Sequence, residues 1–162
     1  MERYTIGIIV DRSGSVIMEK EMIENSIELI VEALDNNYLQ DIKKEIIVTY
    51  IGEEDTLLPQ QVKKIDNEEK RNIENILESK NIFELFERIS SAEGRKKLFF
   101  YSDGYFKREV WDRFISKLKE DKKFNEIERI SIGIGEGANK STLKEFSSKG
   151  KVFQYKDIFD LV

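Results

Sequence analysis

The sequence of 162 residues predicts a doubly wound α/β fold, with a mostly parallel six-stranded sheet, one antiparallel edge strand and helices on both faces. Two observations lead to this fold class. Short apolar runs alternate with segments of helical periodicity, and the loops between them are short. The strongest apolar runs are continuous rather than alternating, which is typical of parallel strands covered on both faces. We expect residues 1–162 to form a single domain.

The first third of the chain is expected to contain three strands and one long helix. Residues 4–10 form the first apolar run, and residues 45–51 form the second. Residues 62–65 form a weak third strand, which we place at an edge because the nearby Pro59 cannot donate to a ladder. The intervening helix has its apolar positions on one face: Met18, Met22, Ile23, Ile27, Ile30, Val31 and Leu34.

The same alternation continues to the end of the chain. In order, the expected elements are helices at 68–79 and 82–92, a strand at 97–102, a helix at 107–121, a strand at 127–135, a short helix at 140–149, a strand at 151–155 and a terminal turn of helix at 157–162. In doubly wound sheets, ligands bind beyond the carboxyl ends of the strands, near the point where the strand order reverses. The loops after Val10, Ile51, Ser102 and Gly135 are therefore where we expect a functional site.

The composition narrows the chemistry that is open to this protein. The formal net charge of -5 argues against a nucleic-acid partner, since such proteins usually carry a basic face. Cysteine and histidine are both absent, so disulfides, thiolate metal sites and the commonest general base are excluded. Any metal must be a hard cation held by oxygen. No stretch approaches the roughly 20 apolar residues of a membrane span, and we expect a cytoplasmic protein without a membrane partner.

Oxygen-bearing side chains follow two of the predicted central strands. Asp11, Ser13 and Ser15 come directly after the first strand, and alternate residues of an extended loop point to the same side. Gly14 between them allows the backbone to turn tightly. Asp103 follows the strand that ends at residue 102. Two carboxylates with two hydroxyls suit magnesium, which prefers octahedral oxygen ligands and keeps several waters.

These two segments resemble the motifs of von Willebrand factor A (vWA) domains. "DRSGS" matches the DxSxS motif of that family, and "YSDG" matches its second aspartate motif. The resemblance covers essentially the whole chain and implies a vWA fold, which is Rossmann-like, with a metal-ion-dependent adhesion site (MIDAS). It implies Ser13 and Ser15 as direct ligands of Mg²⁺, with Mn²⁺ or Ca²⁺ as substitutes, and Asp11 and Asp103 as direct or water-mediated ligands. The partner protein would supply its own Asp or Glu to the open coordination position.

The third loop of the resemblance departs from the family pattern. Where the family has a "GGTN"-like segment, this chain has "ESKN", so that Lys80 takes the place of the threonine. A lysine ammonium about 4 Å from a divalent ion would repel it by several kcal/mol at an effective dielectric near 20. Two alternatives remain open. Either the site is metal-free and Lys80 neutralises Asp11 and Asp103, or Lys80 points to solvent and Ser79 or a water fills the position.

Two further segments lie near these loops, and each has a structural interpretation beside a functional one. Tyr105 and Phe106 should lie at the rim of the crevice as partner-binding residues, with packing of Phe106 under the following helix as the alternative. Trp111 is expected in the core. The segment "GIGEGANKS" superficially resembles a phosphate loop, but it has Asn139 where that motif requires glycine. We expect it to be a turn followed by a helix N-cap.

These features favour a protein–protein interaction module over an enzyme. Within that family, the chain resembles the small, stand-alone bacterial proteins of the TerY type, which are found with tellurium-resistance and stress systems. In the absence of metal, Lys80 would provide the positive charge for an acidic partner residue. One alternative is Mg²⁺-dependent phosphoryl transfer, although Ser13 stands where a dehalogenase-like phosphatase has its second aspartate. Another alternative is a structural subunit without a working site.

Overall fold

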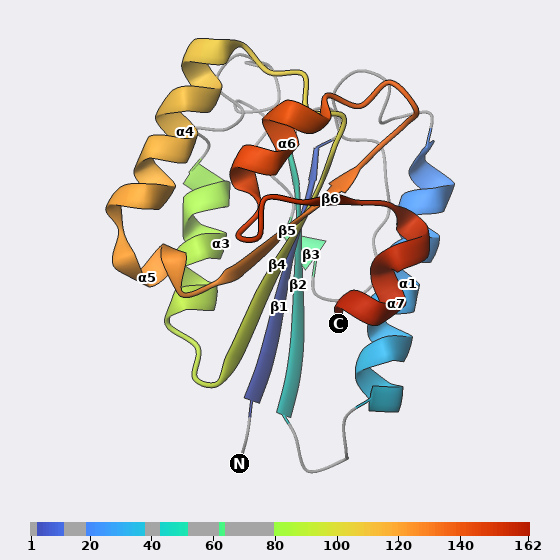
Figure 1. Cartoon of the computed structure of the whole chain (residues 1–162). Coiled ribbons are helices and arrows are strands. Elements are labelled where there is room, and N and C mark those ends of the chain that lie inside the picture. Colours follow the sequence, from blue (N-terminus) through green and yellow to red (C-terminus); the bar gives the residue numbers. More distant parts are fainter. Residues whose placement is uncertain (1–2, 12–18, 38–42, 52–61, 64–79) are drawn as a thin grey trace.

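The computed structural model is a parallel sheet with helices packed on both of its faces (Figure 1). It describes residues 3–11, 19–37, 43–51, 62–63 and 80–162, with the backbone alone for residues 37, 62, 63, 80 and 81. The sheet order is β3-β2-β1-β4-β5-β6. The strands are β1 (Arg3–Asp11), β2 (Lys43–Ile51), β3 (Val62–Lys63), β4 (Arg95–Ser102), β5 (Glu128–Gly133) and β6 (Val152–Phe153).

The prediction of an antiparallel edge strand is wrong. β3 pairs parallel with β2, with Val48 opposite Val62 and Thr49 opposite Lys63, and every other strand pair among the described residues is also parallel. An edge strand of two residues carries too little sequence pattern to fix its direction, which depends on its pairing with the neighbouring strand.

Two hydrophobic cores cover the two faces of the sheet. One core lies under α3 (Lys80–Ser90), α4 (Arg108–Glu120), α5 (Lys122–Asn125) and α6 (Lys140–Phe146), and the other lies under α1 (Lys20–Asn37) and α7 (Ile158–Leu161). β1 contributes to both: Ile8 belongs to the second core and Ile9 to the first. This burial on both sides explains why the central strands are continuously apolar.

The long helix α1 confirms most of its predicted apolar face. Ile23, Ile27, Ile30 and Leu34 are buried against the sheet. Met22 and Val31, which we predicted to share that face, are 52% and 42% exposed. At 100° per residue these two positions fall on opposite flanks of the buried stripe, outside the width that the sheet covers. Met18 and the predicted helix at 68–79 lie outside the described residues.

The remaining helices occur close to where the sequence predicts them, with two small differences. α5 is a single turn that was not predicted, and the Asp121 side chain caps it by accepting from the Lys123 backbone N–H. The last predicted strand shortens to β6 and continues into the 3₁₀ turn η3 (Tyr155–Asp157). No helix in the described part of the chain has both the length and the apolar character needed to cross a membrane.

Trp111 is a core residue, as predicted. It is 1% exposed and packs against Phe100 and Phe114. Its indole Nε1 donates to Glu145 Oε2 at 2.5 Å, and Arg108 donates to the other oxygen of that carboxylate at 2.9 Å. These bonds join α4 to α6 and satisfy the one polar atom of the tryptophan, as burial requires.

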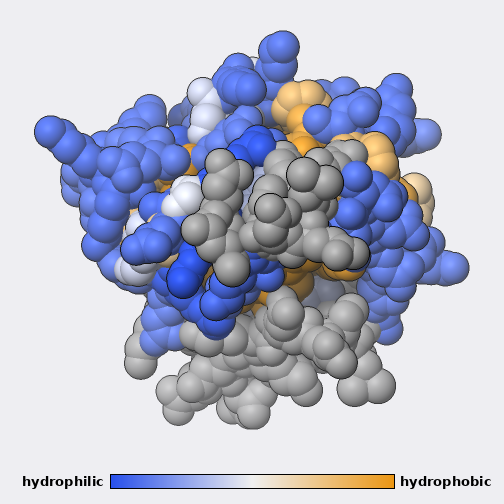
Figure 2. All heavy atoms as spheres, turned by 90° about the horizontal axis from the view of Figure 1, so that it is seen from below, coloured by the Kyte–Doolittle hydropathy of each residue, from blue (hydrophilic) through white to orange (hydrophobic). Residues whose placement is uncertain are grey.

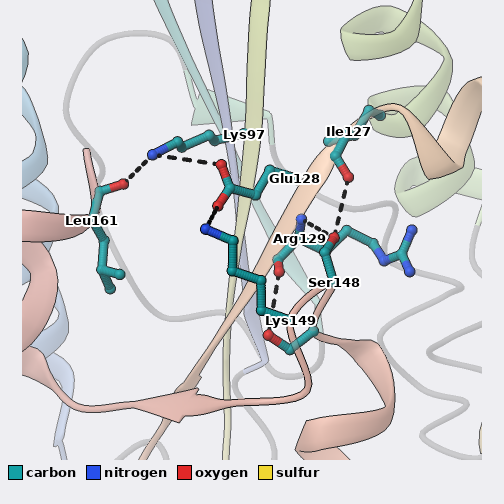
Figure 3. Close-up of polar contacts among 8 residues, drawn as sticks. Lys97, Ile127, Glu128, Arg129, Ser148, Lys149 and Leu161 are labelled. Atoms are coloured by element: carbon teal, nitrogen blue, oxygen red, sulfur yellow. Dashed lines mark hydrogen bonds and ion pairs between the residues drawn. The ribbon is translucent and has the colours of Figure 1, made fainter.

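A buried lysine lies near the amino end of the sheet, on the side of α7 (Figure 3). The surface at this end of the sheet is mostly hydrophilic where the structure describes it, with a smaller hydrophobic area (Figure 2). Although charged residues are usually exposed at such a surface, Lys97 is only 9% exposed. Its Nζ donates to the Leu161 carbonyl at 2.5 Å and lies 3.6 Å from Glu128, which also pairs with Lys149 at 3.2 Å. Through this hydrogen bond and this ion pair, Lys97 connects the end of α7 to β4 and β5.

Burial lowers the pKa of Lys97, and Glu128 only partly opposes this effect. The folded protein then binds the Lys97 proton less tightly than the unfolded chain does, whose lysines titrate at about 10.4. Between the lowered pKa and that value the unfolded chain holds more protons, so the free energy of unfolding rises with pH. Relative to a Lys97→Met variant, we expect the wild type to gain stability as the pH is raised from 7 to 10.5. Urea denaturation across this range measures the difference, and a flat or falling difference would contradict the assignment.

Candidate functional site at the carboxyl ends of β1 and β4

The strand order reverses between β1 and β4. From β1 the chain proceeds outward to β2 and β3 on one side, and from β4 to β5 and β6 on the other. In doubly wound sheets this reversal opens a crevice beyond the carboxyl ends of the two strands, where ligands bind. Asp11 is the last residue of β1, and Asp103 directly follows the last residue of β4. The two predicted carboxylates thus stand at neighbouring strand ends.

Ser102 links these two strand ends. Its side chain and that of Asp11 are both fully buried, and Ser102 Oγ donates to Asp11 Oδ2 at 2.8 Å across 91 residues of sequence. The Gly104 backbone N–H donates to the same Ser102 Oγ at 3.0 Å. Because the hydroxyl accepts from Gly104, its own proton is directed at the carboxylate. This chain of bonds holds the Asp11 carboxylate in one orientation.

Asp103 is held by the turn that follows it. It is 6% exposed, and its Oδ1 accepts from the Tyr105 backbone N–H at 3.1 Å, as in an Asx turn. Its backbone carbonyl accepts from the Asn139 N–H at 2.7 Å. Gly104 has a φ of 78°, which favours glycine because a side chain clashes in this region.

The loop at residues 134–139 forms a wall beside this turn. Ile134 N–H donates to the Ser102 carbonyl at 3.0 Å, and the Tyr105 hydroxyl donates to the Gly137 carbonyl at 2.5 Å. Asn139 ends the loop as the N-cap of α6, where its side chain accepts from the Thr142 N–H. The predicted turn and N-cap in this segment are confirmed. The loop therefore positions the backbone around both Ser102 and Asp103.

The two predicted aromatic rim residues have different surroundings. Tyr105 is 63% exposed in the turn that follows Asp103. Phe106 is half-buried and stacks on Trp111 with ring centroids 5.2 Å apart, and it also contacts Phe100. Packing of Phe106 against the core under α4 is thus the alternative that the structure supports, and Tyr105 is the aromatic side chain available at the rim.

The structure does not describe the side chains of the other predicted site residues. Ser13, Ser15 and Ser79 lie outside the described residues. Lys80 is the first residue of α3, and its side chain is also outside them. Sequence reasoning overlooked Ser102 as a site residue. The available signal was its place just before Asp103, at the end of a strand predicted to lie in the centre of the sheet.

Asp11 and Asp103 are hard oxygen donors of the kind that Mg²⁺ prefers. Magnesium is commonly held by one or two carboxylates and keeps several waters. Among the described residues there is no group of three or more His, Cys, Asp or Glu side chains that could hold a metal ion. A cation at this place would therefore depend on hydroxyl or water ligands in addition to the two carboxylates.

The turn after β4 can be tested with a matched pair of glycine substitutions. A Cβ at Gly104 would lie 2.6 Å from the Asn139 carbonyl oxygen, and the positive φ adds strain. We expect Gly104→Ala to lower the free energy of unfolding by about 2–4 kcal/mol. Gly137→Ala in the same wall meets nothing within 4 Å, and we expect a change within about 0.5 kcal/mol. Thermal or urea unfolding measures both, and equal effects would argue against tight contact between the two loops.

Comparison of the sequence with protein-family models and with curated proteins finds no match. The functional assignment therefore depends on the residues themselves and on where the fold places them. The fold is an α/β fold of the Rossmann-like kind, with a parallel sheet ordered β3-β2-β1-β4-β5-β6 and two carboxylates at the reversal of strand order.

Proposed function

We propose that this chain is a protein–protein interaction module of the vWA type, which binds an acidic side chain of a partner protein in the crevice between β1 and β4. The observation that carries the proposal is the bond from Ser102 to Asp11 at 2.8 Å. It brings the end of the "DRSGS"-bearing strand against the "YSDG" segment at the reversal of strand order. The resemblance to vWA domains requires these two motifs to meet at this place.

A cation would link this pair of carboxylates to an acidic partner. Asp11 is fully buried and Asp103 is 6% exposed, and they stand at adjacent strand ends. A positive charge bound beside them would attract a partner carboxylate. Mg²⁺ held by Asp11, Asp103, Ser13 and Ser15 would supply this charge together with an open coordination position. The Lys80 ammonium would supply the charge alone.

The proposed role is binding, and it requires no covalent chemistry. The chain has neither histidine nor cysteine, which leaves nucleophilic schemes poorly supported. Tyr105, exposed at the rim, would contact the partner beside the charged group. By the same resemblance, we propose a single cytoplasmic domain that acts in a bacterial stress or tellurium-resistance type of system.

The role of Lys80 can be measured by magnesium titration. If its ammonium opposes metal binding, Lys80→Thr will gain more thermal stability from Mg²⁺ than the wild type does. Ligand at 100 times its Kd stabilises a protein by about 2.7 kcal/mol, and each kcal/mol raises the Tm of a chain of this size by about 2–4 °C. We therefore expect the Tm of Lys80→Thr to rise by at least about 5 °C at saturating Mg²⁺.

Matched variants separate the crevice from general effects of charge. Lys119→Thr removes an exposed lysine of α4 and should respond to Mg²⁺ as the wild type does. Adding Asp11→Asn to Lys80→Thr should abolish the gain, whereas adding Asp160→Asn, an exposed carboxylate, should not. An equal or larger response in the wild type would refute the role given to Lys80. If the protein hydrolyses a generic phosphate ester and this activity requires both Mg²⁺ and Asp11, the binding proposal is wrong and the function is enzymatic.

A further inference from the structure

A recess lies at the carboxyl ends of β5 and β6, apart from Asp11 and Asp103. It has a volume of about 300 Å³ and is partly open to solvent. Gly133 and Phe153 line it from the two strands, the loop at 134–139 borders one side, and residues 154–157 border the other. This volume is at the lower end of the range for small-molecule sites. The recess therefore suits a ligand of small size.

Two of the three charged side chains that line this recess are lysines, and the Glu19 carboxylate lies near Gly135 at its border. Lys140 and Lys156 line it from opposite sides, one at the start of α6 and the other in η3. Neither lysine makes an ion pair with another residue in the part of the chain that the structure describes. Asp157, which also lines the recess, accepts from the Gln154 backbone N–H at 3.0 Å and keeps its negative charge. Because neither lysine is held in an ion pair there, the two ammonium groups are available to an anion.

The lining of the recess is more polar than apolar, and part of it is made by small residues. Gly133, Gly135 and Ala138 leave the space between the loop and the strands open. A Cβ at Gly133 would lie 3.2 Å from Val152, so the glycine keeps β6 close to β5. A mainly polar recess with two lysines in its lining fits a small anion, whose oxygens accept charge-assisted hydrogen bonds.

We propose that this recess binds a small anion, whose carboxylate or phosphate group is held by Lys140 and Lys156. The site is separate from the crevice of the proposed function, since Asp11 and Asp103 do not line it. The two nevertheless share a wall: the loop that borders the recess donates from Asn139 to the Asp103 carbonyl at 2.7 Å.

Titration with simple probes, followed by amide NMR shifts at constant ionic strength, tests the site. Benzoate, phenyl phosphate and inorganic phosphate distinguish a carboxylate from a phosphate ligand and show whether an apolar part is needed. We expect saturable shifts at residues 135–138 and 152–157 with benzoate or phenyl phosphate. Uncharged benzamide should bind at least about tenfold more weakly, because it lacks the charge-assisted bonds. Equal binding of benzamide, or no saturable shift with any anion, would overturn the proposal.

Paired lysine variants test whether the two ammonium groups carry the binding. Lys140→Gln with Lys156→Gln should weaken the bound probe by at least about tenfold. Lys122→Gln with Lys144→Gln changes the net charge equally, at exposed positions that do not line the recess, and should leave the affinity unchanged. All four side chains are exposed, so both variants are expected to fold. Equal losses in the two variants would mean attraction by net charge alone and would refute a built site.

Discussion

The parallel pairing of β1 with β4 is the constraint on which the rest of this structure depends. The pairing runs from Tyr4 opposite Arg95 to Val10 opposite Tyr101, and it sets the reversal of strand order in the middle of the sheet. By continuation of that register, Asp11 meets Ser102, and the hydroxyl of the serine holds the carboxylate. A shift by one residue would turn every side chain of β1 to the opposite face and separate these two groups.

The carboxyl edge of the sheet combines two kinds of chemistry on one rigid base. Near the centre, buried carboxylates are held by hydroxyl and backbone donors, an arrangement that is suited to a cation. Toward the β6 edge, two exposed lysines line a small recess, an arrangement that is suited to an anion. The loop between β5 and α6 borders both, through its bonds to Ser102 and Asp103. A change in the conformation of that loop would therefore alter both the Asp11–Asp103 site and the recess lined by Lys140 and Lys156.

Sequence reasoning succeeded where the physical signal is local. The continuous apolar runs located the central strands, and the helical period located α1, although it also included Met22 and Val31 on the flanks of the buried stripe. The position of Asp11 and Asp103 at strand ends followed from the same runs. The surroundings of Phe106 could not be predicted from the sequence. Its spacing from Trp111 is equally compatible with an exposed rim and with the stacking in the core that the structure has.

By itself, the sequence determined the class of fold, the alternation of strands and helices and the restriction to oxygen chemistry, because each of these follows from the composition or from a period within one segment. Only the tertiary structure decided the parallel direction of β3, the contact of Ser102 with Asp11 and the recess between Lys140 and Lys156. These features join segments that are distant along the chain. They depend on the register and order of the strands, which no local pattern records.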